Sequence, residues 1–95
     1  MEKINKKTLV IGASLNPSRY SNLVIHKLLA HGHEVVALGK ASGTIAGVKI
    51  DIQPLPYNDL NTVTLYLNPT NQVAFYDYIV SVKPKRVIFN PGTEN

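Results

Sequence analysis

Apolar residues along the chain fall into five short runs, separated by segments that contain glycine, proline or polar residues. The runs are rich in Val, Ile and Leu, and runs of this length and composition are typical of buried β-strands. They predict strands at residues 8–12, 34–38, 48–52, 62–67 and 86–90. The run at 48–52 alternates apolar and polar positions, so that strand is expected to be half exposed.

Residues 21–31 carry apolar side chains at three- and four-residue spacing, which is the pattern of an amphipathic helix. The repeating positions are Leu23, Val24, Ile25, Leu28 and Leu29. Ser18 or Ser21 is the predicted N-cap, because a short hydroxyl side chain accepts a bond from a first-turn N–H. Gly32 suits the position just past the helix end.

A second helix is predicted after Asn68 and Pro69, a polar cap followed by proline at the first helical position. Pro84 ends it, since proline cannot continue a helix. Its predicted apolar positions are Val73, Tyr76, Ile79 and Val80, with Phe75 and Val82 nearby.

Strands that alternate with helices over short links indicate an α/β domain with a mainly parallel sheet and right-handed crossovers. Residues 1–95 are expected to form one Rossmann-like domain with strand order 3-2-1-4-5, counted along the chain. The link at 41–47 is too short for a helical crossover, so the third strand is expected at an edge, in either direction. Ligands of such sheets bind where the order reverses, here between the first and fourth strands.

Gly12 ends the first strand, and small polar residues lead from it into the first helix. Glycine lets a ligand approach the backbone closely, and the N–H groups at a helix start hold phosphate. Ser14, Asn16 and Ser18 carry short side chains that bond either backbone or ligand. A phosphate-bearing ligand is therefore expected here. By this reasoning Gly12→Val abolishes binding and leaves the fold intact.

This loop departs from the dinucleotide fingerprint G-x-G-x-x-G, because Ser14 and Pro17 stand where that pattern has glycines. Gly39 and Lys40 follow the second strand, where an NAD site usually places a carboxylate. A cation there suits a ligand with an additional ribose phosphate. The alternative interpretation is a solvated surface turn.

The chain has 95 residues, a formal net charge of +4, 44% hydrophobic residues and no cysteine. These values predict a folded cytoplasmic domain without disulfides, and no apolar run approaches the roughly 18 residues of a membrane span. Most cations precede the first and last strands, at the sheet edge opposite the ligand side. No aromatic residues interleave with them, so a nucleic-acid partner is not expected.

Four motifs of this chain resemble those of the small stand-alone CoA-binding proteins of bacteria. These proteins are similar to the CoA-binding domain of the succinyl-CoA synthetase α subunit. They are V-I-G-A-S-L-N-P-S-R-Y at 10–20, H-G-H-E-V-V at 31–36, L-N-P at 67–69 and F-N-P-G-T-E-N at 89–95. The resemblance extends from about Lys7 to Asn95, with the motifs in family order. It implies CoA or acyl-CoA as the ligand.

The resemblance also implies where CoA lies. Its phosphates would meet Gly12, Ala13, Ser14, Asn16, Pro17, Ser18 and Arg19. Adenine and its ribose phosphate would lie near Gly39 and Lys40. The pantetheine arm would pass Leu67, Asn68, Pro69, Asn90, Pro91 and Gly92. Tyr20 opens the first helix beside this site and is a further candidate contact.

Members of this family usually continue after the last motif with another helix and strand, and these are absent from this sequence. Either the sequence is part of a longer chain, or an edge of the sheet is missing. A missing edge exposes strand hydrogen-bonding groups and apolar surface. We therefore expect a homodimer, an unidentified protein partner or weakened stability.

No catalytic constellation stands out in the sequence. His31 and His33 flank a helix end, where histidine commonly meets the last carbonyl groups, and no third metal ligand accompanies them. The six carboxylates are scattered, and Ser14 lacks the G-x-S-x-G elbow of hydrolases. A non-catalytic CoA-binding module is expected. The alternatives are an NADP-dependent reductase fragment, a ligase subunit that needs a partner, and a regulatory module with a vestigial pocket.

Overall fold

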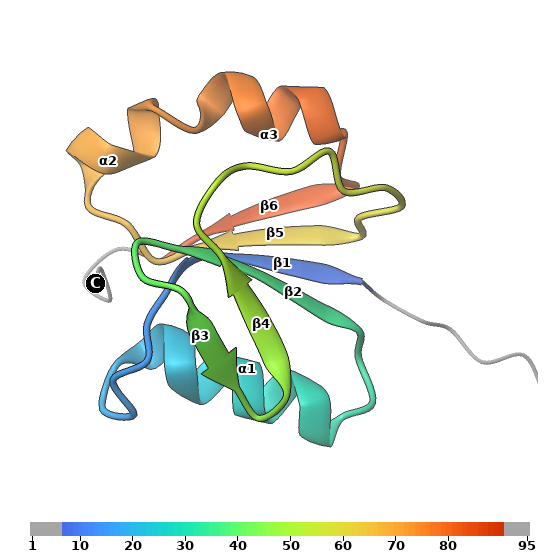
Figure 1. The fold of residues 1–95 in the computed structure, drawn as a ribbon. Coiled ribbons are helices and arrows are strands. Elements are labelled where there is room, and N and C mark those ends of the chain that lie inside the picture. Colours follow the sequence, from blue (N-terminus) through green and yellow to red (C-terminus); the bar gives the residue numbers. More distant parts are fainter. Residues whose placement is uncertain (1–6, 91–95) are drawn as a thin grey trace, which may run out of the picture.

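The computed structural model describes residues 7–90 and shows one six-stranded sheet with helices on both sides (Figure 1). One helix, α1, packs on one face, and α2 and α3 lie on the other side. The elements are β1 (Thr8–Ala13), α1 (Tyr20–Ala30), β2 (Val35–Gly39), β3 (Gly43–Ile45), β4 (Val48–Asp51), β5 (Thr62–Leu65), α2 (Pro69–Val73), α3 (Tyr76–Val82) and β6 (Arg86–Phe89). The predicted α/β fold class is confirmed.

The strand order is β3-β4-β2-β1-β5-β6, with β1 at the centre of the sheet. β1 pairs in parallel with β2 on one side and with β5 on the other. β4 is parallel to β2, and β6 is parallel to β5. The order 3-2-1-4-5 predicted for the five sequence-derived strands is therefore confirmed, and the order reverses at β1 and β5.

The prediction that the strand near 48–52 forms the sheet edge is wrong, because β3 lies outside it. β3 runs antiparallel to β4, with Ile45 opposite Val48. The two residues between them, Ala46 and Gly47, have φ values of 50° and 87°, and a pair of positive φ values makes a tight hairpin turn. The chain thus reverses twice, and β4 joins β2 in parallel without a helical crossover.

The central strand β1 is buried from both sides. Leu9 and Ile11 pack in the cluster that includes Ile79 of α3, whereas Val10 packs in the cluster that includes Ile25 of α1. All three β1 side chains are at most 1% exposed. Burial of apolar surface on both faces fixes this strand, and the loop that leaves its carboxyl end starts from a rigid position.

Helix α1 begins at a different cap from the predicted one. Its N-cap is Arg19, which makes no side-chain capping bond. Ser18 bonds within the preceding loop, and Ser21 is buried inside the first turn, so neither acts as the cap. The predicted end is confirmed, because Gly32 follows the last turn with a φ of 79°.

The helix predicted after Asn68 forms as two short helices. Asn68 caps α2 as predicted, since its side chain accepts a 2.8 Å bond from a first-turn N–H. The predicted apolar face is partly wrong: Val73 and Val80 are 62% and 73% exposed. The predicted positions Ile79 and Val82 are confirmed, since both pack in the core cluster, and Phe75 packs against it.

Residues 52–61, which we call the β4–β5 connection, cross the sheet on the same side as α3 without forming a helix or strand (Figure 1). Near its end, Leu60 is buried in the core cluster together with Ile79 and Val82. An extended segment therefore takes the place of a crossover helix in this half of the sheet.

Candidate functional site

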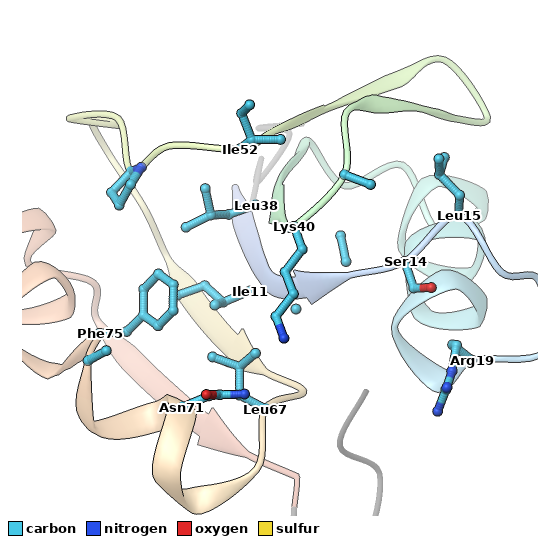
Figure 2. A pocket seen from close by; sticks show the side chains of 16 residues that line it. Ile11, Ser14, Leu15, Arg19, Leu38, Lys40, Ile52, Leu67, Asn71 and Phe75 are labelled. Carbon is cyan, nitrogen blue, oxygen red and sulfur yellow. The ribbon is translucent and has the colours of Figure 1, made fainter.

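A pocket of about 420 Å³ lies where β1, β2 and β5 end (Figure 2). The ends of β1 and β2 contribute Gly12 and Gly39, and Leu67 follows β5. This is the crevice at the order reversal that the sequence predicts. Its volume lies near the lower end of the ~300–1,000 Å³ usual for small-molecule sites.

The loop after β1 is shaped by hydrogen bonds among its own side chains. Ser14 Oγ accepts from the N–H of Asn16 at 3.1 Å. Asn16 Oδ1 accepts from the N–H and the hydroxyl of Ser18, at 3.0 and 2.8 Å. Buried Asn22 in α1 donates its side-chain amide to the carbonyl oxygen of Ser14 at 2.8 Å. Asn16 and Ser18 thus serve the loop, while the Ser14 hydroxyl hydrogen can still point into the pocket.

Two cations line the pocket, Arg19 at the N-cap of α1 and Lys40 after β2. Figure 2 shows the Lys40 side chain extending between the Ser14 side and the Asn71 side. The first turn of α1 has no acidic residue, and among residues 7–90 no carboxylate lines the pocket. The positive end of the helix dipole adds to these charges, so this polar end of the pocket favours anions.

The other end of the pocket is apolar. Figure 2 shows Ile11, Leu38, Ile52 and Phe75 grouped on the side away from Ser14 and Arg19. Ile52 is 57% exposed, and Leu15 on the opposite rim is 46% exposed. Large apolar side chains left open at the rim of a pocket are well placed to be covered by a ligand. We call Ile11, Leu38, Ile52 and Phe75, together with Pro54, the apolar end of the pocket.

The glycines at the base of the pocket are required by neighbouring backbone. A Cβ on Gly12 would lie 2.8 Å from the carbonyl oxygen of Tyr66, and Gly12 has a φ of 92°. A Cβ on Gly39 would overlap the carbonyl oxygen of Ala13. The expectation that Gly12→Val leaves the fold intact is therefore wrong, because the added side chain meets protein before it meets any ligand.

Seven of the predicted site residues line this one pocket. They are Gly12, Ala13, Ser14, Arg19, Gly39, Lys40 and Leu67. Segments that are far apart in the sequence, around residues 12–19, 39–40 and 67, are thus brought together as the predicted topology requires.

The remaining predicted residues do not line it. Asn16, Pro17 and Ser18 belong to the loop that encloses it, and Asn68 and Pro69 form the start of α2. Tyr20 lines a separate shallow groove together with Leu23 and Tyr66. The Asn90 amide donates to the Thr64 hydroxyl and the Leu65 carbonyl, both at 2.8 Å. Pro91 and Gly92 lie outside the described residues.

Several lining residues were not predicted. They are Ile11, Leu15, Leu38, Ala41, Ile52, Pro54, Asn71, Ala74 and Phe75. Asn71 could have been found, because the first turn of a helix that follows β5 must face the same edge as the loop after β1. Ile52 was expected to be the last residue of the strand at 48–52, but β4 ends at Asp51. Pro54 gave no signal, since the connection after Ile52 has neither helical nor strand periodicity.

Other site chemistries find little support in residues 7–90. No group of three His, Cys, Asp or Glu side chains is arranged to hold a metal ion in this part of the chain. The His31 ring nitrogen Nδ1 lies 2.8 Å from the carbonyl oxygen of Lys27, which confirms its helix-end role. Within the same residues no helix is long and apolar enough to cross a membrane.

The sheet order and the pocket at its reversal define a Rossmann-like α/β domain. The chain belongs to the CoA binding domain family, whose model matches residues 6–95. The family predicted from the sequence motifs is thereby confirmed.

Two solved structures share this fold. The crystal structure of an uncharacterized protein is 47% identical, with a TM-score of 0.90, and the match covers 98% of this chain and 77% of that one. A conserved hypothetical protein from Pyrococcus furiosus is 28% identical, with a TM-score of 0.78, and the match covers 95% of this chain and 78% of that one. Among curated proteins, no sequence matches.

Proposed function

We propose that this chain binds CoA or acyl-CoA without catalysing a reaction on it, and that the CoA phosphates lie at the polar end of the pocket. Membership of the family supports CoA binding in general. The observation that carries the finer proposal is that Arg19, at the N-cap of α1, and Lys40, after β2, line one pocket, to which residues 7–90 contribute no carboxylate.

The positions of the lining residues suggest which part of CoA each of them contacts. The diphosphate faces the N–H groups at the start of α1, the Ser14 hydroxyl and Arg19. Lys40 follows β2, where it meets the 3′-phosphate on the ribose. A pocket of about 420 Å³ is smaller than the largest ligand sites, so we place part of the CoA molecule outside it, beyond Leu67.

The non-catalytic part of the proposal rests on the chemistry of the lining. No His, Cys, Asp, Glu or Tyr side chain lines the described surface of the pocket, and Lys40 is the one side chain there of a type that commonly transfers protons. Ser14 has no base beside it there. The effect of the protein would then fall on a partner protein or on the supply of free CoA.

Calorimetric titration with CoA, dephospho-CoA, NADP and NAD tests the proposal. CoA is expected to bind most tightly, dephospho-CoA more weakly because it lacks the 3′-phosphate, and NAD weakest because it lacks both an additional ribose phosphate and the pantetheine arm. NADP binding as tight as CoA binding would favour the reductase alternative. Absence of binding by all four would contradict the proposal and favour a vestigial pocket.

A further inference from the structure

The β4–β5 connection supplies Ile52 and Pro54 to the apolar end, although it has no secondary structure of its own. Residues 52–56 are all exposed. A segment without a backbone ladder keeps a fixed position only if other bonds hold it. Two tyrosine hydroxyls supply such bonds.

Tyr57 donates its hydroxyl to the carboxylate of Asp51, the last residue of β4. Tyr78 in α3 donates its hydroxyl to the carbonyl oxygen of Leu55. The first bond ties the connection back to the strand it leaves, and the second ties its middle to the helix that covers the sheet. Ile52 and Pro54 lie in the sequence between Asp51 and Leu55, the residues that accept these two bonds.

Tyr78 also reaches the opposite wall of the apolar end. Its ring packs edge-on against the ring of Phe75, with the centroids 6.5 Å apart. Phe75 lines the pocket directly. Tyr78 therefore contacts the lining residue Phe75 through its ring, and through its hydroxyl it contacts Leu55, which directly follows the lining residue Pro54.

Both rings remain anchored when the hydroxyl is removed. Tyr57 and Tyr78 pack against the core cluster that contains Leu60 and Ile79. Burial, and then the hydrogen bond to Asp51, raise the pKa of Tyr57, and burial raises the pKa of Tyr78. Both phenols thus remain protonated donors at neutral pH.

We infer that Tyr57 and Tyr78 are positioning residues of the CoA site: their hydroxyls hold Ile52 and Pro54 against the ligand and set the width of the apolar end. This inference rests on the proposed function. The two tyrosines do not line the pocket themselves, so they act through the β4–β5 connection.

The experiment compares Tyr57→Phe and Tyr78→Phe with Tyr76→Phe. Tyr76 is a matched control because it lies in the same helix as Tyr78, does not line the pocket, and shows no hydroxyl hydrogen bond in the described structure. Dissociation constants for CoA and dephospho-CoA are measured for each variant, and urea unfolding checks that each is folded. The first two variants are expected to bind both ligands about five-fold more weakly, as loss of one hydrogen bond implies. Tyr76→Phe is expected to bind like the native protein.

The preference for CoA over dephospho-CoA is the readout that general damage would change. If the polar end is intact, this preference stays at its native value in Tyr57→Phe and Tyr78→Phe while both affinities fall. Unchanged affinities, a lost preference, or equal weakening in Tyr76→Phe would each overturn the positioning role. Failure of the native protein to bind CoA would instead overturn the proposed function, and this inference with it.

Discussion

At the scale of single residues, Lys40 is the side chain that we expect to distinguish CoA from related ligands. It lines the pocket at the end of β2, where the proposal places the 3′-phosphate. We expect Lys40→Ala to weaken CoA binding roughly five-fold, since a partly solvated charge contact contributes about 1 kcal/mol, and to leave dephospho-CoA binding unchanged. Titration of both ligands at low and high salt measures this, because salt screens the contact.

Lys49→Ala is the control, because Lys49 is exposed on β4 and does not line the pocket. It removes the same charge from the chain without touching the site. Equal losses for CoA and dephospho-CoA in Lys40→Ala would show that Lys40 meets a different phosphate.

At Gly12 the steric cost of an added Cβ can be separated from the cost of its positive φ. Gly12, Gly32 and Gly47 have similar φ values of 92°, 79° and 87°, but a Cβ would meet neighbouring atoms only at Gly12. Gly32→Ala and Gly47→Ala are expected to lower the free energy of unfolding by about 1 kcal/mol, the cost of a left-handed alanine. Gly12→Ala is expected to cost about 2 kcal/mol more, because the backbone at Tyr66 must move.

Urea unfolding of the three variants and the native protein measures this difference. Gly32→Ala and Gly47→Ala report the conformational cost alone, because no atom lies within 4 Å of the added Cβ. If all three alanine variants lost the same stability, the Tyr66 carbonyl would not constrain position 12.

At the scale of elements, the sequence predicts those helices and strands whose apolar residues recur with a regular period. The strand order and the crevice beside Gly12 follow from alternating strands and helices. β3 was missed because it is three residues long and depends on positive φ at Ala46, an uncommon conformation for alanine. The break between α2 and α3 was missed because two apolar patterns overlap there, and packing on the sheet selects the one containing Ile79 and Val82.

The same distinction applies to the site. Gly12, Ser14 and Lys40 stand next to strands whose ends can be predicted, so topology brings them together. Ile52 and Pro54 reach the pocket through a segment whose path is set by tyrosine side-chain bonds, and such bonds leave no periodic pattern.

The β4–β5 connection gives an element-scale prediction on pH. The pKa of Tyr57 is raised above its ordinary value near 10, so the folded protein holds this proton more tightly than the unfolded chain. Its contribution to stability is therefore complete below about pH 10 and is lost as the pH rises further. We expect stability to fall more steeply between about pH 9.5 and 11.5 in the native protein than in Tyr57→Phe. Urea midpoints across this range measure it, and parallel curves would contradict it.

At the scale of the whole molecule, β6 is an edge strand that pairs only with β5 in the described sheet. Its residues Ile88 and Phe89 are 38% and 48% exposed. An open strand edge with apolar side chains favours association, so a homodimer remains our prediction. Sedimentation velocity over a range of concentrations measures it, with Phe89→Lys expected to shift the protein toward monomer. A concentration-independent monomer would contradict it.

The second prediction at the scale of the whole molecule is that the chain shows no turnover. Because the described pocket surface carries no His, Cys, Asp, Glu or Tyr side chain, the purified chain is expected to leave acetyl-CoA, succinyl-CoA and NADPH unchanged. Single-turnover assays with protein in excess over substrate detect slow chemistry that steady-state assays miss. A reaction that disappears in Ser14→Ala or His33→Ala would replace the binding module with an enzyme.

The two glycines at the base of the pocket also limit which residues can be substituted when the ligand preference of the protein changes. Gly12 and Gly39 fit backbone against backbone, so almost any substitution there damages the domain before it alters recognition. The surrounding residues Leu15, Lys40 and Ile52 are all at the pocket surface, and they are open to substitution. Evolution or design is therefore expected to adjust ligand preference by substitutions at these three positions, while the main chain at the base of the pocket stays unchanged.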